Sequence, residues 1–166
     1  MKKALSLLLA LAAAFTLSAS ALAADTETMT IPVTLTVVHT SKNIDVTLPA
    51  ALPVSVVDEQ VYTADNLVIR NNSTTTGVRV SGVSVTNGAY TVASYNSFPA
   101  SSPARIALRI NGCATTGAGS LAINATAFPT IGAGGSLPIR YAAKVSDSGD
   151  VAGLDAAHVI FTLRAG

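Results

Sequence analysis

The stretch MTIPVTLTVV, residues Met29 to Val38, has the clearest structural pattern in the chain. Its odd positions are all apolar, and four of its five even positions are Thr or Pro. This alternation with period two predicts a β-strand with one buried face. The apolar positions are Met29, Ile31, Val33, Leu35 and Val37. Two readings stay open, because the strand can belong to its own domain or complete the sheet of a second copy.

The residues before this strand have the pattern of a secretory signal peptide. Lys2 and Lys3 precede an apolar run from Ala4 to Leu17, and Ala21-Leu22-Ala23 supplies the small residues of a cleavage site. The apolar run is shorter than the roughly 20 residues that span a membrane. We therefore predict removal of residues 1–23, a single domain over 24–166, and a secreted, extracellular or cell-surface protein without a membrane span after cleavage.

The charge of the chain restricts its partners. Charged residues make up 11% of the chain, against about 25% in typical soluble domains. Two of the 10 basic residues lie in the leader, so eight basic residues face nine acidic ones. Nucleic-acid binding requires clustered Lys and Arg, and the sequence shows no such cluster, so we expect no nucleic-acid partner. A Thr-rich surface with few charges favours a wall or matrix protein and leaves sheet edges open to pairing.

The same alternation recurs through the chain, and no run repeats at helical spacing. The other alternating runs begin at Ile44, Leu52, Leu67, Ile106, Leu121, Leu137 and Val159. Gly, Pro, Asn and Ser separate these runs at the spacing of a sandwich. We predict an all-β fold, specifically an antiparallel two-sheet β-sandwich, immunoglobulin-like, with about nine strands.

Two local turns are also predicted. Asn87-Gly88 is a favoured two-residue hairpin turn, and Asp58-Glu59 is expected to form a hairpin turn rather than an acid/base pair. The first hairpin would pair Thr86 with Ala89, Val85 with Tyr90, and Val83 with Val92. Upstream, Val78 and Val80 are out of phase with Val83 and Val85. A β-bulge at Ser81-Gly82 would return both pairs to one face.

The polar residues form no recognisable catalytic or metal motif. His39 and His158 stand at the two ends of the predicted domain, and the chain has neither HExxH nor GxSxG. Asp147, Asp150 and Asp155 come closest to a calcium loop, but their spacing does not match an EF-hand. We expect no enzyme activity, no cofactor and no metal; a hydrolase is the less favoured reading.

Cys113 is the single cysteine, so disulfides within the chain cannot stabilise the domain. It is expected to be a partly buried residue at a strand end, with an intermolecular disulfide as the alternative.

A candidate ligand loop lies in YNSFPASSPAR. Tyr95 and Phe98 fall outside the alternation, and Arg105 follows them, so the loop has the aromatic and polar groups of a sugar-binding site. The alternative is a loop held in place by its own aromatic residues.

Several runs carry a resemblance to a known class of proteins. They are IPVTLTV, IDVTLPAALPVSV, TADNLVIRNNSTTTGVRVSGVSVTNG and the terminal VIFTL. Together they resemble the small exported β-sandwich surface proteins of Gram-positive bacteria and, more distantly, WxL-type cell-surface domains. The chain has no Trp and therefore lacks the hallmark WxL residue. The resemblance implies a fold and a compartment, and no functional residue is carried over.

Two functions follow from these features. The first is a non-catalytic structural or adhesive protein that assembles with itself by exchanging strand 28–38. The second is a module that binds cell-wall or other extracellular carbohydrate through the Tyr95–Phe98 loop.

Overall fold

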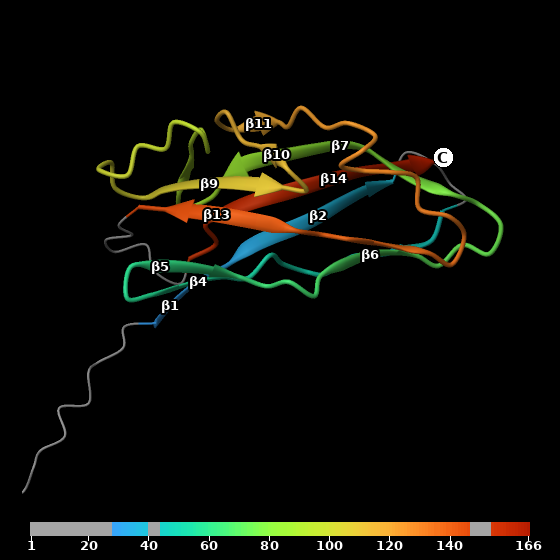
Figure 1. Ribbon diagram of the computed structural model, residues 1–166, viewed down its shortest axis with the longest axis horizontal. Coiled ribbons are helices and arrows are strands. Elements are labelled where there is room, and N and C mark those ends of the chain that lie inside the picture. Colours follow the sequence, from blue (N-terminus) through green and yellow to red (C-terminus); the bar gives the residue numbers. More distant parts are fainter. Residues whose placement is uncertain (1–27, 40–43, 147–153) are drawn as a thin grey trace, which may run out of the picture.

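The computed structural model describes residues 28–39, 44–146 and 154–166, and the predicted signal peptide lies outside these ranges. The described chain is all β (Figure 1). Its strands are β1 (Thr28–Ile31), β2 (Val33–His39), β3 (Val46–Thr47), β4 (Val54–Val57), β5 (Gln60–Thr63), β6 (Val68–Asn71), β7 (Val78–Asn87), β8 (Thr91–Val92), β9 (Arg105–Ile110), β10 (Cys113–Ala114), β11 (Gly119–Ser120), β12 (Ser136–Pro138), β13 (Tyr141–Val145) and β14 (Ala157–Ala165).

These strands form four sheets. Two have four strands each, β11-β7-β14-β2 and β10-β9-β13 with β8 beside β9. The other two have three strands each, β1-β4-β5 and β12-β6-β3. The expected count of about nine strands was therefore too low. Four of the strands are only two residues long (β3, β8, β10 and β11), and two residues are too few to show an alternation.

β14 lies at the centre of the largest sheet. It pairs with β7 in antiparallel orientation and with β2 in parallel orientation. β8 and β9 are also parallel, so the prediction of a purely antiparallel fold was wrong for two strand pairs. The reason is that alternation reports a half-buried strand whatever the direction of its neighbour.

The predicted bulge is present. The pairing of β7 with β14 steps from Gly82 opposite Thr162 to Val80 opposite Leu163, which leaves Ser81 as the extra residue. Val78, Val80, Val83 and Val85 are all buried, as expected if the bulge restores one inward face. The Asp58-Glu59 turn is also confirmed, because it joins the antiparallel pair β4 and β5 with both residues at positive φ.

The hairpin predicted at Asn87-Gly88 was wrong. β7 already has β14 on one edge and β11 on the other, so the chain after Asn87 cannot fold back against it. Residues 88–90 instead cross the start of β14. Ala89 N donates to Asp155 O at 2.8 Å, while Gly88 N and Tyr90 N donate to Ala156 O. Glycine is required at position 88, where a Cβ would lie 2.3 Å from Asp155 O.

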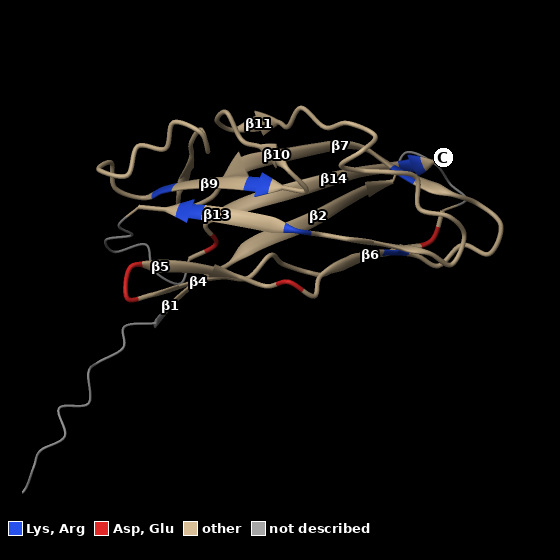
Figure 2. Ribbon diagram, in the orientation of Figure 1, with Lys and Arg blue, Asp and Glu red and all other residues tan. Residues whose placement is uncertain are grey.

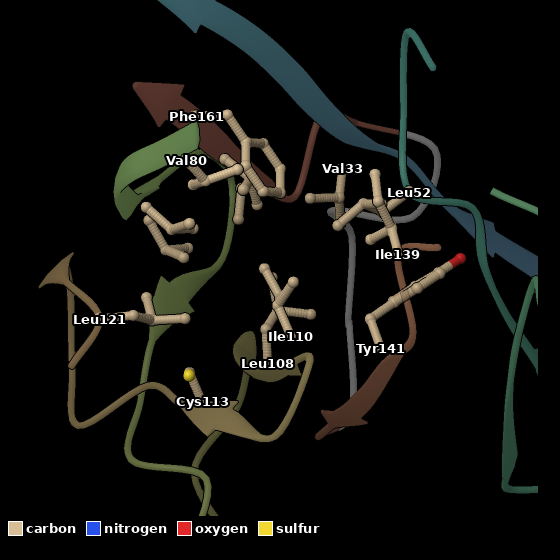
Figure 3. Close-up of a cluster of buried hydrophobic side chains, with 14 of the residues drawn as sticks. Val33, Leu52, Val80, Leu108, Ile110, Cys113, Leu121, Ile139, Tyr141 and Phe161 are labelled. Carbon is tan, nitrogen blue, oxygen red and sulfur yellow. The ribbon is translucent and has the colours of Figure 1, made fainter. Parts of the chain in front are cut away.

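The hydrophobic core lies between the sheet of β7 and β14 and the sheet of β9 and β13 (Figure 3). Phe161 and Val80 approach it from one side, and Leu108 and Ile110 approach it from the other. Phe128 packs edge-on against Phe161, with ring centroids 6.3 Å apart. This core is continuous through the described residues and accounts for the inward positions of the longest strands.

Tyr141 links this core to the sheet formed by β1, β4 and β5. Its hydroxyl donates to the carbonyl of Pro53 and accepts a hydrogen bond from Ala64 N at 3.0 Å. Thr63 Oγ1 donates to the Tyr141 carbonyl at 3.1 Å. Burial raises the pKa of the Tyr141 hydroxyl above its ordinary value, and the hydrogen bond from Ala64 partly opposes that shift.

Candidate functional site

The opening stretch divides into two strands at Pro32. The odd positions face the core as predicted, with Ile31 and Val33 fully buried and the other three partly buried. The expectation of one continuous strand was wrong, because β1 pairs with β4 whereas β2 pairs with β14. Proline has no N–H to donate and fixes φ, so it separates the two pairings without changing the alternation.

β1 is the edge strand of its sheet. It pairs with β4 from Thr28 opposite Val57 to Ile31 opposite Val54, and within the described residues no strand covers its other side. Its main anchor is Ile31, whose side chain is 1% exposed. β1 is therefore a short strand on the periphery, held by one neighbour.

β2 is fixed much more firmly. It pairs with β14 over seven residues, and Ala156 N donates to Pro32 O at 2.8 Å. On its other side, Leu52 N donates to Val33 O and Leu35 N donates to Ala50 O. The change from a firmly held strand to a peripheral one thus occurs at Pro32.

The candidate ligand loop is organised around Tyr95. Arg109 Cζ lies 4.8 Å from the centroid of its ring, and Lys144 Nζ lies 4.6 Å from the same centroid. Lys144 Nζ also donates to the Tyr95 carbonyl at 2.9 Å, and Tyr95 N donates to Thr115 O. The ring is therefore engaged by two cations at distances typical of cation–π contacts.

Phe98 and Arg105 occupy separate positions. Phe98 is half-buried in a loop that turns on itself, where Ala100 N donates to Phe98 O at 3.1 Å. Arg105 begins β9, and its backbone N–H donates to Ser146 Oγ at 2.8 Å. The sequence identified Tyr95 and Arg105, but it missed Arg109 and Lys144 as partners of the ring. The sequence indicates that Arg109 and Lys144 point outward, because each alternates with apolar residues. It does not indicate that β9 and β13 are neighbours, which is what brings the two cations together.

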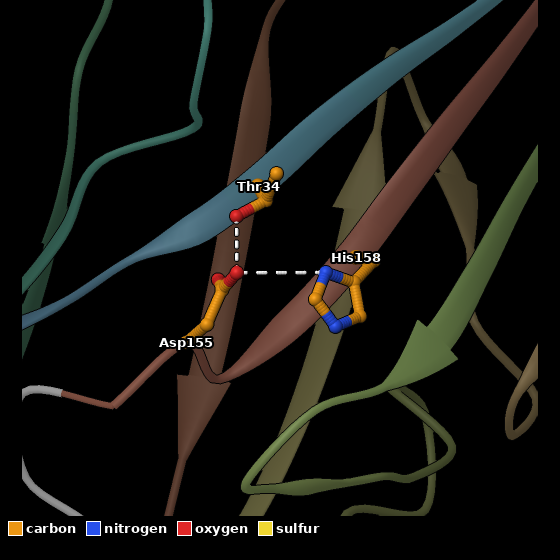
Figure 4. Close-up of polar contacts among 3 residues, drawn as sticks. All are labelled: Thr34, Asp155 and His158. Atoms are coloured by element: carbon orange, nitrogen blue, oxygen red, sulfur yellow. Dashed lines mark hydrogen bonds and ion pairs between the residues drawn. The ribbon is translucent and has the colours of Figure 1, made fainter.

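A second polar cluster joins β2 to the start of β14 (Figure 4). The Thr34 hydroxyl donates to Asp155 Oδ2, and His158 Nδ1 lies 3.5 Å from the same oxygen. Thr34 and His158 face each other in the parallel register. The carboxylate lies between the other two groups, so the hydroxyl contacts Asp155 and not the imidazole, whereas the hydroxyl of a Ser–His–Asp triad contacts the histidine. The cluster connects β2 to the start of β14, and its order of groups differs from that of a Ser–His–Asp triad.

The two histidines do not meet, although they lie on neighbouring strands. Parallel pairing places His158 opposite Thr34 and His39 opposite Leu163, at opposite ends of the ladder. Among the described residues, no three His, Cys, Asp or Glu side chains are grouped so that they could hold a metal ion. Asp147 and Asp150 of the predicted loop lie outside the described ranges.

Cys113 is buried in β10 and packs in the core. In Figure 3 its sulfur points toward the other core side chains rather than outward. A candidate membrane-spanning helix, long and apolar enough to cross a bilayer, is missing from the part of the chain that the structure describes.

Comparison with known proteins gives no assignment, because no family model, curated protein or solved structure matches the chain. The resemblance to small exported surface proteins, and to WxL-type domains, therefore stays a prediction.

Proposed function

We propose that this chain is a non-catalytic secreted or cell-surface protein with a structural or adhesive role, and that it assembles by exchanging its N-terminal strand. We include the finer fold in this proposal, namely an immunoglobulin-like sandwich in which the four sheets stack as two layers. The core between the β7–β14 and β9–β13 sheets supports such stacking. The resemblance to exported surface proteins of Gram-positive bacteria belongs to the same proposal.

The observation that carries the proposal is the position of β1. It is the first described strand, it pairs with one neighbour only, and it is separated from the firmly held β2 by Pro32. These features narrow the exchanging segment from the predicted 28–38 to β1 alone. Pro32 is the hinge, since the hydrogen bond from Ala156 fixes the chain immediately after it.

Exchange would replace each contact of β1 with the same contact in a neighbour. Ile31 would leave its own core and fill the equivalent site of another copy, and burial of such a side chain contributes about 1.5–3 kcal/mol. The register with β4 would be preserved. The contact free energy that β1 gains in the second copy would therefore nearly equal the contact free energy that it loses in its own chain. The balance between closed monomers and linked chains would then depend on concentration and on the hinge.

Paired cysteine variants of residues 24–166 test this exchange. Met29 and Val56 are directly opposite in the register, so Met29→Cys and Val56→Cys chains, both carrying Cys113→Ala, are mixed and oxidised. Exchange predicts a disulfide-linked heterodimer that increases with protein concentration. Thr36→Cys and Ile160→Cys chains are the matched control, because they pair β2 with β14. For each pair, a double variant within one chain establishes that the bond can form.

A heterodimer from the β1 pair alone supports exchange of β1. Heterodimers from both pairs would extend the exchanging segment to 28–38. Equal, background amounts from both pairs would contradict the proposal.

The second candidate function is a module for cell-wall or other extracellular carbohydrate that uses the Tyr95–Phe98 loop and Arg105. The observation in its favour is the ordered setting of Tyr95 beside two cations at the surface. It predicts a monomer that is retained on wall material, with retention lost in a Tyr95→Ala, Phe98→Ala variant. Assembly predicts instead that the same double variant still forms heterodimers.

A further inference from the structure

Four basic residues lie on or directly beside the paired strands β9 and β13 (Figure 2). Arg105 and Arg109 belong to β9, Lys144 belongs to β13, and Arg140 directly precedes β13. The pairing of β9 with β13 places these side chains on one face of the sheet. Arg109 lies opposite Ala142, and Lys144, two residues further along β13, lies opposite Ala107. The sequence shows no basic cluster because two segments about 30 residues apart supply these four side chains; we call them the basic face.

The basic face has no acidic partner in the described part of the chain. The ion pair found among the described residues joins His158, in β14 of another sheet, to Asp155, which precedes that strand. Asp58-Glu59 form the turn between β4 and β5, and Asp65 lies in the segment between β5 and β6; neither site forms an ion pair with the four cations among the described residues (Figure 2). Within the described residues, Arg109 and Arg140 therefore form no ion pair with a carboxylate, whereas the Lys144 ammonium donates to the Tyr95 carbonyl.

Two of these cations border a shallow depression of about 190 Å³. It is lined by Arg109, Gly112, Arg140, Tyr141 and Ala142. This volume is below the roughly 300 Å³ of the smallest drug-sized pockets, so it has room for one charged group or one ring. The two guanidinium groups are the only charged groups among these lining residues, and guanidinium binds oxyanions in a bidentate manner.

The surroundings hold the side chain of Arg109 and the backbone of Arg140 in place. Arg109 lies over the Tyr95 ring, which Lys144 also contacts. The backbone of Arg140 is fixed by Asn111, because Arg140 N donates to Asn111 Oδ1 at 2.8 Å and Asn111 N donates to Arg140 O at 2.7 Å. A site whose parts are already ordered loses less entropy when a ligand binds.

We infer that the basic face binds an anionic polysaccharide, and that Arg109 and Arg140 together hold one carboxylate or sulfate group of it. Arg105 and Lys144 extend the positive surface along the strands toward neighbouring charges of the same polymer. This inference does not depend on exchange of β1, since the basic face belongs to different strands.

Nucleic acid fits this face less well. Duplex binding commonly neutralises six or more phosphates, roughly 6–10 in well-studied cases, and this face offers four cations. Single-stranded binding relies on free aromatic rings for base stacking, whereas Tyr95 is already engaged by Arg109 and Lys144.

The test measures binding of residues 24–166 to the anionic polysaccharides dextran sulfate and polygalacturonate, to neutral dextran and to single-stranded DNA, by isothermal titration calorimetry at low salt. We expect the two anionic polymers to bind, dextran to give no heat, and affinity to fall as salt rises. The Arg109→Gln, Arg140→Gln variant should weaken binding by about tenfold or more, as expected for lost charge-assisted hydrogen bonds. The control Arg70→Gln, Arg164→Gln carries the same charge change on exposed residues of β6 and β14 and should change affinity less than about twofold.

The outcomes separate cleanly. Preference for polygalacturonate or for dextran sulfate identifies a carboxylate or a sulfate as the preferred group, and either supports the inference. Equal losses of affinity in the two double variants would mean that binding depends only on net charge, and would overturn the inference. Absence of binding to both anionic polymers, or tighter binding to single-stranded DNA, would also overturn it. A loss of self-association in the Arg109→Gln, Arg140→Gln variant without a change in polymer binding would assign the face to a second copy instead.

Discussion

β1 and β14 are the first and last of the described strands, and they occupy opposite kinds of position in the sheets. β14 has a neighbour on each side and four inward side chains with no exposed surface, namely Ala157, Val159, Phe161 and Leu163. β1 has one described neighbour, and of its residues 29–31 only Ile31 is fully buried. Both show the same alternation in sequence, so alternation reports which face is buried and not how firmly the strand is held.

This difference suggests a division of roles. β14 organises the sheet by joining β7 to β2, and it supplies Phe161 and Leu163, two of the largest fully buried side chains. β1 adds a small increment of burial at the periphery, which is the condition under which a segment can separate while the rest of the domain stays folded. Variants that disturb one strand or the other therefore test the comparison directly.

The largest effect is expected from Phe161→Ala in β14. Phe161 is fully buried and packs against Phe128, so truncation removes apolar contacts and leaves a cavity. We expect a loss of about 3–5 kcal/mol in the free energy of unfolding, measured by urea denaturation. Met29→Ala in β1 is the comparison, and it should cost about 1 kcal/mol or less because Met29 is only partly buried. Similar losses in both variants would remove the distinction between the two strands.

A smaller effect is expected at the crossing that fixes the start of β14. In Gly88→Ala the new Cβ would lie 2.3 Å from Asp155 O and 2.9 Å from Ala156 O. The crossing segment must shift, with loss of its hydrogen bonds to residues 155 and 156, at a cost of about 1–3 kcal/mol. Gly132→Ala is the matched control, since its Cβ would meet nothing within 4 Å. An unchanged urea midpoint for Gly88→Ala would contradict the tight packing described above.

Tyr141→Phe tests the connection between the core and the sheet that contains β1. The change removes hydrogen bonds to Pro53 O and from Ala64 N and should cost about 1–2 kcal/mol at neutral pH. It should also alter the alkaline limit of stability. The pKa of Tyr141 is raised in the folded state above its ordinary value of 10.0, so the folded chain favours the neutral hydroxyl.

The direction of this pH dependence follows from linkage. The contribution of Tyr141 is fully present below the pKa of the unfolded chain, near 10.0, and is lost as pH rises through the higher pKa of the folded state. Urea midpoints measured from pH 8 to 11 should therefore fall more steeply for the parent chain than for Tyr141→Phe. Parallel curves for the two proteins would show that Tyr141 does not couple proton binding to folding.

Much of this architecture could be predicted from the sequence, but only where the signal was local. The alternation of β9 and β14, the bulge at Ser81 and the turn at Asp58-Glu59 each depend on residues close together in the chain. The hairpin at Asn87-Gly88 failed because β11 and β14 already occupy both edges of β7. Those neighbours come from more distant segments, so no local pattern could reveal them.

The candidate sites divide in the same way. Tyr95 could be predicted as a candidate because it lies outside the apolar alternation. The β1 segment could be predicted as a strand because it follows that alternation. The basic face was not, since it depends on the pairing of β9 with β13. The division of the opening strand at Pro32 was also hidden, because the apolar alternation continues without a break through the proline.

The smallest effect is expected from Thr34→Val, which sharpens the comparison at the junction of the first and last segments. Valine keeps the shape of the side chain but cannot donate to Asp155, so β2 loses its polar link to the start of β14 while the seven-residue ladder remains. The side chain of Asp155 is 40% exposed, so water replaces much of the lost bond, and we expect a cost of about 1 kcal/mol or less in the free energy of unfolding.

Hydrogen exchange is the informative measurement for Thr34→Val, because it resolves local opening. Faster exchange at Ala156 N, which donates to Pro32 O, with little change in the centre of β14 would locate the effect at the hinge beside β1. Faster exchange along all of β14 would instead mean that the cluster stabilises the whole ladder, and that β1 and β14 are less independent than their positions indicate.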